Sequence, residues 1–338
     1  MSLAFVTGAN GFIGSHLVEA LLDRGIRVRC LVRKKSHTKY LPKDDVELIR
    51  GDVEQEGLLR EAFYGAEIVY HVAGLTAAFA AKDFLRINGD GARHVAQACA
   101  QQANPPKLVL ISSIAASGPA PRGQIRVEAD TPAPISEYGR SKLAGEVAAG
   151  EFAATVPLVI VRPGVVFGPR DPGLLPVFQS LKYFNLHALP GYESPALSYI
   201  YVKDLIEVIL RAAERGQTVP PAGGASSVGQ GVYFAVAPEY PTYADLGKLI
   251  GRLMGRPFPL VLPCLPPFPW VVAGVNEVIG RLIGKPSGVG FDKMREGLAT
   301  SWACSAEKVK CDLGFAHPKS LKERLEETTA WYRAEKWL

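Results

Sequence analysis

Tyr138 and Lys142 are the side chains in this sequence best suited to proton transfer. They stand four residues apart at the start of a predicted helix, Tyr138–Phe152, so they share one helix face. An ammonium group beside a phenol lowers the phenol's pKa from about 10 toward neutrality, which makes tyrosine a usable proton donor or base. We therefore expect Tyr138 and Lys142 to be catalytic.

The spacing alone does not identify this pair, because Tyr199–Lys203 and Tyr332–Lys336 share it. Only Tyr138 follows a predicted strand that ends in Ser112-Ser113 within one βαβ unit. The ends of parallel strands face the ligand crevice of an α/β sheet. The other two pairs are interpreted as coincidence.

A glycine-rich turn, Thr7-Gly8-Ala9-Asn10-Gly11-Phe12-Ile13-Gly14, follows the first predicted strand and opens a helix. Glycines at these positions permit a tight turn, a close approach of a pyrophosphate, and packing of helix on strand. The free N–H groups of the helix then bind the phosphates. In this context the turn predicts a dinucleotide site, whereas an ordinary strand-to-helix turn is the alternative.

The second predicted strand, Arg27–Val32, is followed by Arg33 and Lys34. An NAD site usually offers a carboxylate here, whereas an arginine accommodates the 2′-phosphate of NADP. The sequence therefore favours NADP(H), with NAD(H) as the alternative, unless this is only a solvated basic loop. Asp52, just after the third strand, is placed to accept a hydrogen bond from the adenine amino group.

The elements that position these residues alternate strand with helix, which is typical of βαβ units around a parallel sheet. Several of the expected strands are apolar on both faces, as strands covered by helices on each side must be. The expected strands are Leu3–Thr7, Arg27–Val32, Val46–Arg50, Ile68–Val72, Leu108–Ser112 and Leu158–Arg162, and the helices are Phe12–Arg24, Glu56–Tyr64, Asp83–Gln101 and Tyr138–Phe152. We predict an α/β fold with a Rossmann-type doubly wound parallel sheet.

The pattern changes after Pro163, where proline and glycine become dense and the strands shorten to Ser198–Val202 and Val232–Val236. We expect residues 1–165 to form the dinucleotide-binding domain, with returning segments near 198–236, and residues 166–338 to form mostly a smaller C-terminal substrate lobe. Thr242 with Asp245 resembles a helix cap. Helices are expected at Lys203–Arg215, Tyr243–Met254, Val271–Ile283 and Leu321–Arg333.

Taken together, the sequence resembles an extended short-chain dehydrogenase/reductase of the NAD(P)-dependent epimerase/dehydratase family. The resemblance covers roughly residues 3–215, and its motifs stand in the family's order: Thr7-Gly8-x-x-Gly11-x-x-Gly14, Asp52-Val53, His71-Val72-Ala73-Gly74, Asn88, Ser112-Ser113, Tyr138-x-x-x-Lys142 and Arg162-Pro163-Gly164. It implies that Ser113 orients the reacting oxygen, Tyr138 passes the proton and Lys142 also holds the nicotinamide ribose.

The same resemblance implies further contacts. Ala73 and Gly74 line the cofactor, and the backbone after Pro163, at Gly164 and Val165, meets the carboxamide. Asn88 is carried over as a fourth catalytic residue. Each has a structural alternative: Ser113 merely ends a strand, Asn88 bonds backbone between two elements, and His71 is a satisfied core histidine. A homodimer is also expected from the family.

Two departures from the family narrow the reaction. Ser113 is followed by Ile114-Ala115, where sugar-nucleotide dehydratases resembling this fold carry an Asp-Glu pair. Val165 stands where many nucleotide-sugar epimerases carry an asparagine that holds the substrate pyrophosphate. The segment instead resembles dihydroflavonol-reductase-like and 3β-hydroxysteroid-dehydrogenase-like members, which act on less polar substrates.

The lobe expected to cover the substrate is also apolar, with Leu260, Val261, Leu262, Leu265, Phe268, Trp270 and Val271, although a core or a dimer face is the alternative. We therefore expect an NADP(H)-dependent carbonyl reductase or alcohol dehydrogenase. The alternatives are a UDP-sugar 4-epimerase with tightly held NAD(H), in which Arg170 and Arg295 bind the anionic substrate, and a non-catalytic sensor or scaffold.

Composition excludes several other classes. Net charge is only +5, from 38 basic and 33 acidic residues without a dense basic patch, which argues against nucleic-acid binding. The five cysteines are widely spaced, so we expect reduced thiols in the cytoplasm and no metal site. No signal peptide is visible, and prolines in the uncharged stretch 257–271 break any spanning helix.

Overall fold

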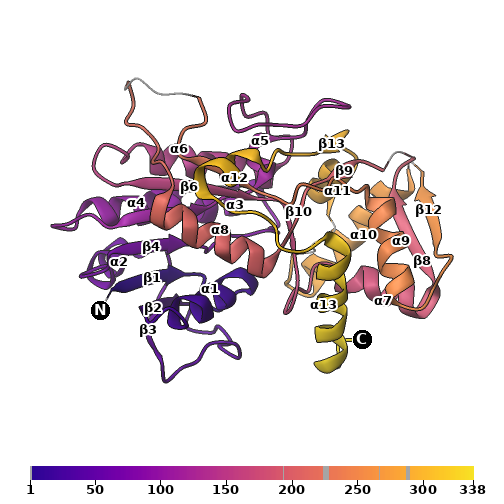
Figure 1. Ribbon diagram of the computed structural model, residues 1–338, viewed down its shortest axis with the longest axis horizontal. Coiled ribbons are helices and arrows are strands. Elements are labelled where there is room, and N and C mark those ends of the chain that lie inside the picture. The colour runs from indigo at the N-terminus through magenta and orange to yellow at the C-terminus, as the bar shows by residue number, and fades with distance from the viewer. Residues whose placement is uncertain (1, 193, 224–227, 266, 287–289) are drawn as a thin grey trace.

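The computed structural model describes residues 2–192, 194–223, 228–265, 267–286 and 290–338. A seven-stranded sheet with strand order β11-β6-β5-β4-β1-β2-β3 forms its larger part, and every neighbouring pair is parallel (Figure 1). The strands are β1 Leu3–Thr7, β2 Arg27–Val32, β3 Val46–Arg50, β4 Ile68–His71, β5 Lys107–Ile111, β6 Leu158–Pro163 and β11 Val232–Ala235. The predicted doubly wound sheet is confirmed.

Helices bury both faces of the sheet. One face packs against α1 (Phe12–Leu22), α8 (Val202–Arg215) and α12 (Glu307–Leu313), and the other against α2 (Glu56–Ala62), α4 (Gly91–Ala100) and α6 (Glu137–Gly150). Side chains alternate along β1, so Val6 joins the first core and Phe5 the second. Burial on each side stabilises by about 1.5–3 kcal/mol per large apolar side chain.

The helix predicted over Asp83–Gln101 is interrupted in the structure. It consists of α3 (Ala81–Phe84), the π-helical turn η1 (Leu85–Asp90) and α4. The wider turn contains Asn88 and packs against α6. π-Helical turns are rare, and hydrophobic periodicity does not reveal them.

The C-terminal lobe packs α7 (Leu175–Phe184), α9 (Tyr243–Leu253) and α13 (Leu321–Ala334) around a separate apolar core. Short parallel pairs join it to the sheet domain and within itself: β7 (Val165–Phe167) with β10 (Tyr199–Tyr201), β9 (Ala196–Leu197) with β13 (Ser301–Trp302), and β8 (Leu186–Pro190) with β12 (Leu260–Cys264). The predicted cap of α9 is present as a capping box between Thr242 and Asp245.

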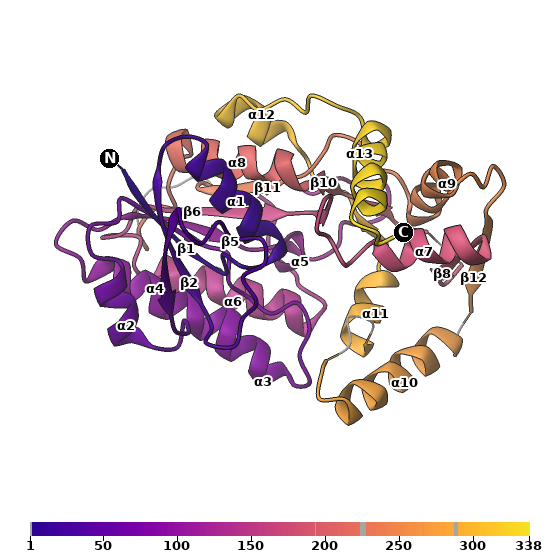
Figure 2. The same ribbon diagram turned by 90° about the horizontal axis from the view of Figure 1, so that it is seen from below.

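Two further helices of the lobe, α10 (Phe268–Leu282) and α11 (Phe291–Gly297), lie beside the sheet domain (Figure 2). The proline-rich stretch 257–271 thus contains β12 and the start of α10, and Pro266 lies outside the described residues. In the part of the chain that the structure describes, no helix combines the length and the apolar character needed to cross a bilayer.

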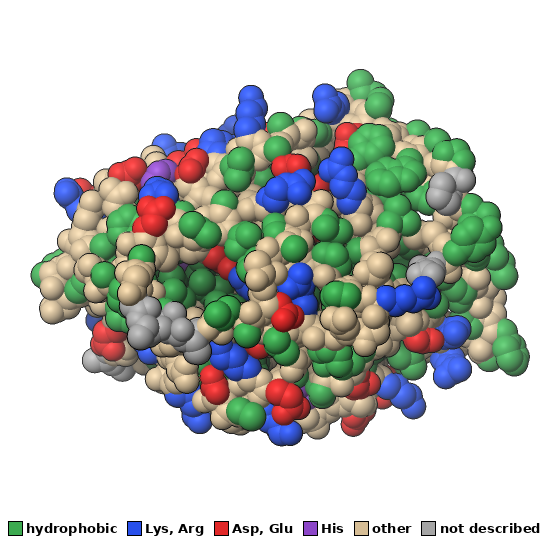
Figure 3. All heavy atoms as spheres, turned by 90° about the horizontal axis from the view of Figure 1, so that it is seen from above, with side chains coloured by type: hydrophobic (Ala, Val, Ile, Leu, Met, Phe, Trp, Pro, Cys, Tyr) green, Lys and Arg blue, Asp and Glu red, His purple; other side chains and the backbone are tan. Residues whose placement is uncertain are grey.

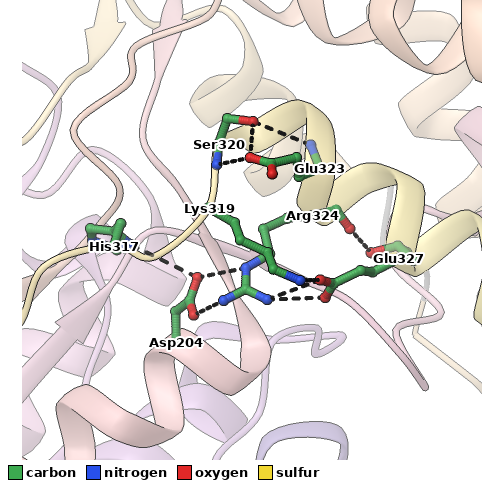
Figure 4. Close-up of polar contacts among 8 residues, drawn as sticks. Asp204, His317, Lys319, Ser320, Glu323, Arg324 and Glu327 are labelled. Carbon is green, nitrogen blue, oxygen red and sulfur yellow. Dashed lines mark hydrogen bonds and ion pairs between the residues drawn. The ribbon is translucent and has the colours of Figure 1, made fainter.

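A buried ion pair fixes the last helix of the lobe to the sheet domain (Figure 4). The guanidinium of Arg324 on α13 donates to both carboxylate oxygens of Asp204 on α8, with Nε 3.1 Å from Oδ2. Arg324 also donates to Glu327 at 3.0 Å, and His317 Nδ1 lies 3.9 Å from Asp204. The side chains of Arg324 and Asp204 are both buried.

Candidate active site

A cavity of about 1050 Å³ opens at the carboxyl ends of the strands and extends into the lobe. It is lined by the β1–α1 turn, by the residues that follow β4, β5 and β6, and by segments of α10 and α11. The crevice beyond the strand ends is where ligands bind in open parallel sheets.

The glycine turn is built for close approach. Gly8 has a φ of +67°, and a Cβ on it would lie 2.7 Å from the backbone nitrogen of Ala73. A Cβ on Gly14 would lie 2.2 Å from the Gly8 carbonyl oxygen, so neither position tolerates a side chain. The helix begins after Gly11 without a side-chain cap. Its first N–H groups therefore fit the pyrophosphate of a dinucleotide.

The predicted cofactor residues that line the cavity span its length. They are Gly8, Gly11, Phe12, Ile13, Gly14, Arg33, Asp52, Val53, Ala73, Gly74, Tyr138, Lys142, Pro163, Gly164 and Val165. Arg33 is exposed at the end where the adenosine would lie. Asp52 stands on the next strand end, so a guanidinium and a carboxylate flank that end of the cavity.

Three of the predicted site residues do not line the cavity. Thr7 is buried, with its hydroxyl 2.8 Å from His71 Nδ1 and accepting from the N–H of Ala73 at 3.1 Å. Lys34 lies in the exposed loop outside. His71 is buried as well, and burial lowers the pKa of its imidazole to about 3.

Asn88 is the third. Its side chain donates to the Leu75 carbonyl at 3.0 Å and to Ser141 at 2.9 Å, and it accepts from the N–H of Leu75 at 2.8 Å. The amide therefore ties η1 to α6 and to the loop after β4. In this structure the Asn88 side chain does not line the cavity.

Ser113, Tyr138 and Lys142 meet in the middle of the cavity. Ser113 caps the short helix α5 (Ile114–Ser117), accepting from the N–H of Ala115 at 3.1 Å, and its side chain also hydrogen-bonds the phenol of Tyr138. Lys142 donates from Nζ to the Ile111 carbonyl at 3.0 Å. The three elements that carry them are β5, α5 and α6, so the expected juxtaposition is present.

The electrostatics differ from expectation. Burial raises the pKa of Tyr138, although the Ser113 hydrogen bond and the ammonium of Lys293 oppose the rise. Burial lowers the pKa of Lys142 to about 8, and its ammonium is directed to the Ile111 carbonyl. Besides burial, the groups that shift the pKa of Tyr138 in this arrangement are Ser113, Lys293 and Glu296, and Lys142 is not among them.

Helix α11, which was not predicted from the sequence, reaches this site from the lobe. Asp292 accepts from the backbone N–H groups of Glu137 and Tyr138, and Glu296 accepts from the Ser136 hydroxyl at 2.6 Å and from Lys293 Nζ at 2.7 Å. The Lys293 side chain remains 61% exposed because it faces the cavity. The only sequence signal is the four-residue spacing of Asp292 and Glu296, which solvated helices share.

The substrate end of the cavity is mainly apolar. Leu174, Leu189, Pro190, Leu197, Phe268, Val272, Met294 and Trp302 line it together with Val165. Arg170 pairs with Glu19 at 2.6 Å, and Arg295 lies 3.6 Å from Asp292; neither lines the cavity. The two arginines that were expected to bind an anionic substrate in a UDP-sugar epimerase therefore pair with carboxylates outside the cavity.

The apolar segment predicted to cover the substrate lies mostly outside the cavity. Of its seven residues, only Phe268 lines the wall, and Leu260, Leu262, Leu265 and Val271 are exposed at the surface. These four exposed residues are therefore not part of the hydrophobic core, which was one alternative for this segment, because a core residue is enclosed by protein.

Comparisons with known proteins place this geometry in a family context. Residues 4–228 match the model of the NAD dependent epimerase/dehydratase family. A ceramide reductase of Caulobacter vibrioides is 31% identical over 335 residues, covering 98% of this chain and 95% of that protein. A putative dihydroflavonol 4-reductase of Synechocystis sp. is 30% identical, covering 97% and 94%. The UDP-glucose 4-epimerase of Thermotoga maritima shares the fold, with a TM-score of 0.78 at 22% identity over 99% of each chain.

Proposed function

The chain belongs to the NAD-dependent epimerase/dehydratase family, and from this premise we propose that it is a reductase that uses NADPH on the carbonyl of an apolar, lipid-like molecule. The enzyme class, an NAD(P)-dependent oxidoreductase of the short-chain dehydrogenase/reductase type, follows from the family and its reductase relatives. The substrate class and the preference for NADPH are the proposal.

The observation that carries the proposal is the pairing of a neutral phenol with apolar walls. Carbonyl reduction needs a proton donor at the oxygen, and burial keeps Tyr138 protonated at neutral pH. Leu189, Phe268 and Trp302 offer an alkyl chain a surface on which burial is favourable. The ceramide reductase relative is named for a lipid substrate, in agreement with such walls.

The chain's own residues have distinct roles in this mechanism. When bound, a nicotinamide cofactor would supply the hydride for the reduction. Ser113 donates a hydrogen bond to the carbonyl oxygen, and Tyr138 gives that oxygen a proton. Lys142 would hold the nicotinamide ribose. The turn at Gly8 and Gly14 holds the pyrophosphate, and Arg33 pairs with the 2′-phosphate.

The substitution Tyr138→Phe tests the mechanism, since it removes only the hydroxyl. We expect turnover of NADPH to fall by at least a hundredfold while thermal-shift binding of NADP(H) is retained. Retained turnover would remove the proposed role of the phenol.

The thermal-shift assay also tests the role of Arg33. A ligand at about a hundred times its Kd stabilises the folded protein by roughly 2.7 kcal/mol. Stronger stabilisation by NAD(H) than by NADP(H) would overturn that role.

The UDP-sugar 4-epimerase remains the second candidate because the fold is shared. Val165 and the engaged Arg170 and Arg295 do not favour a pyrophosphate in the substrate end. Epimerisation of UDP-glucose without added cofactor would favour it. The homodimer and the cytoplasmic location also stay predictions, and sedimentation of the purified protein tests the homodimer.

A further inference from the structure

The lobe carries an exposed apolar surface, here named the apolar face. It consists of Phe258, Leu260, Leu262 and Leu265 around β12 and of Phe268, Val271, Val275, Val278, Ile279, Leu282 and Ile283 on α10. Phe258 and Leu282 are 88% and 81% exposed, so these side chains stand fully in solvent. Hydrophobic side chains gather at the lobe end of the molecule in Figure 3, on the right. An exposed surface of this kind marks an interaction site.

Helix α10 exposes its large apolar side chains and buries mostly small ones, which is the reverse of an ordinary surface helix. Its apolar residues recur at three- and four-residue steps from Phe268 through Val271, Val275 and Val278 to Leu282, and all of them are exposed. Its buried positions are mostly small, including Ala273 and Gly280. A surface helix normally buries its large apolar stripe. This one presents the stripe outward, at the margin of the lobe (Figure 2).

The apolar face is continuous with the substrate end of the cavity. Cys264, Phe268, Pro269 and Val272 line the cavity, and Leu265 and Val271 beside them are exposed on the face. The same two segments therefore form the wall of the cavity and the outer surface.

Basic residues flank the face. Arg252, Arg256, Arg281 and Lys285 are exposed around it. The acidic residue of this segment, Glu277, accepts from the backbone N–H of Phe291 at 3.2 Å. Arg256 also donates to the backbone carbonyl of Lys182 at 2.9 Å, which joins it to α7. Cations around an apolar surface complement an anionic lipid headgroup layer.

We propose that the apolar face docks on the surface of an anionic lipid bilayer. Apolar side chains of β12 and α10 enter the headgroup boundary, and the flanking cations pair with lipid phosphates. A second copy of the chain fits this surface less well, because a two-fold contact repeats the same cations on both sides. Docking does not depend on the reaction. Entry of a lipid substrate from the bilayer past α10 rests on the proposed function.

Vesicle binding by the full chain tests the docking. One set of vesicles contains phosphatidylcholine alone, and the other contains phosphatidylcholine with about 30% of the anionic lipid phosphatidylglycerol. Each set is measured at low and at high salt. We expect sedimentation with the anionic vesicles, weakened by salt because exposed charges are screened. No binding to anionic vesicles would overturn the proposal.

Matched variants locate the contact. Phe258→Asp with Leu282→Asp places two charges on the apolar face, and Tyr64→Asp with Val147→Asp places two on exposed apolar residues elsewhere. We expect the first pair to lower the vesicle partition coefficient by roughly tenfold or more and the second to leave it unchanged. Equal losses would overturn the assignment of the face.

Two further measurements separate the outcomes. The wild type could sediment as a dimer that does not bind vesicles, and the variant Phe258→Asp with Leu282→Asp as a monomer. In that case the apolar face joins two copies of the chain and the proposal is wrong. Phe258 and Leu282 do not line the cavity, so thermal-shift binding of NADP(H) and turnover of a short water-soluble carbonyl should stay unchanged. An inactive wild type that still binds anionic vesicles would refute the proposed function and leave the docking intact.

Discussion

The carboxylate of Asp292 accepts a hydrogen bond from the backbone N–H of Tyr138, with 3.0 Å between Oδ2 and the nitrogen. Its other oxygen accepts from the N–H of Glu137 at 2.7 Å. A residue of the lobe thereby caps the helix that carries the phenol, and a carboxylate at a helix N-terminus is favoured by the helix dipole. The wall of the substrate end and the proton donor are joined through this contact.

Replacing Asp292 with alanine should affect both stability and rate. Loss of the cap lowers the free energy of unfolding by about 1 kcal/mol. Because the first turn of α6 loses its support, we expect kcat to fall by about tenfold or more as the phenol moves from the reacting oxygen. Urea unfolding and steady-state kinetics measure the two effects.

A matched control separates them. Asp245→Ala removes a capping carboxylate from α9, where it accepts from Thr242, away from the phenol. It should cost similar stability and leave kcat near the wild-type value. Equal losses of kcat in the two variants would mean that Asp292 supports only the fold.

Lys293→Met should change the pH dependence of the reaction. The ammonium lowers the pKa of Tyr138, so its removal raises that pKa further. Oxidation of an alcohol needs the phenolate, and its rate should therefore begin to rise at a higher pH. Reduction at neutral pH, where the phenol is already protonated, should change little. The pH profiles of kcat in both directions measure this.

Lys310→Met, on α12, is the control, because Lys310 pairs with Glu307 in solvent. Its profile should match that of the wild type, and Lys293→Arg should restore most of the normal profile. A Lys293→Met enzyme with an unshifted oxidation profile would show that the ammonium does not act on the phenol.

Most of the sheet could be predicted from the sequence, and much of the lobe could not. Leu3–Thr7 is a continuous run of apolar or β-branched residues, whereas Arg27–Val32 and Val46–Arg50 mix such residues with charged ones. The predicted bounds of all three strands match the structure. By contrast, β8 and β12 each contain a proline, which is unfavourable within a strand. They are strands because they pair with each other across about seventy residues of sequence, a tertiary contact that local pattern does not encode.

The candidate site divides in the same way. The glycine turn and the set of Ser113, Tyr138 and Lys142 were predictable because each follows a strand end in chain order. The support from Asp292 and Glu296 was not, because it depends on how α11 folds back onto α6. Their partners at Ser136 and Glu137 stand more than 150 residues earlier.

Asp171 predicts a pH-dependent stability. Its carboxyl is only 4% exposed, and burial raises its pKa to about 6 although the N–H groups of Gly173 and Leu174 donate to it. The folded pKa exceeds the unfolded value near 3.9, so the protonated group stabilises the fold. That contribution is full below about pH 4 and is lost as the pH rises through 6, a change of about 3 kcal/mol.

Asp171→Asn removes this titration. The quantity to follow is the free energy of unfolding of the wild type minus that of the variant. We expect this difference to fall by about 2 kcal/mol between pH 4 and 7 in urea titrations. Asp245→Asn should give the opposite slope, because hydrogen bonds from Thr242 lower the pKa of Asp245. A difference that does not vary with pH would refute the raised pKa of Asp171.

The buried pair of Arg324 and Asp204 gives a prediction about how the lobe is held. Arg324→Met leaves the Asp204 carboxylate buried without its guanidinium, which should cost about 3–5 kcal/mol of unfolding free energy. The double variant Asp204→Leu with Arg324→Met removes both charges and should cost less than the single one. Lys322→Met, which breaks an exposed pair with Glu326, should change stability by less than about 1 kcal/mol. A double variant less stable than Arg324→Met would show that the joint between α8 and α13 needs the charges themselves.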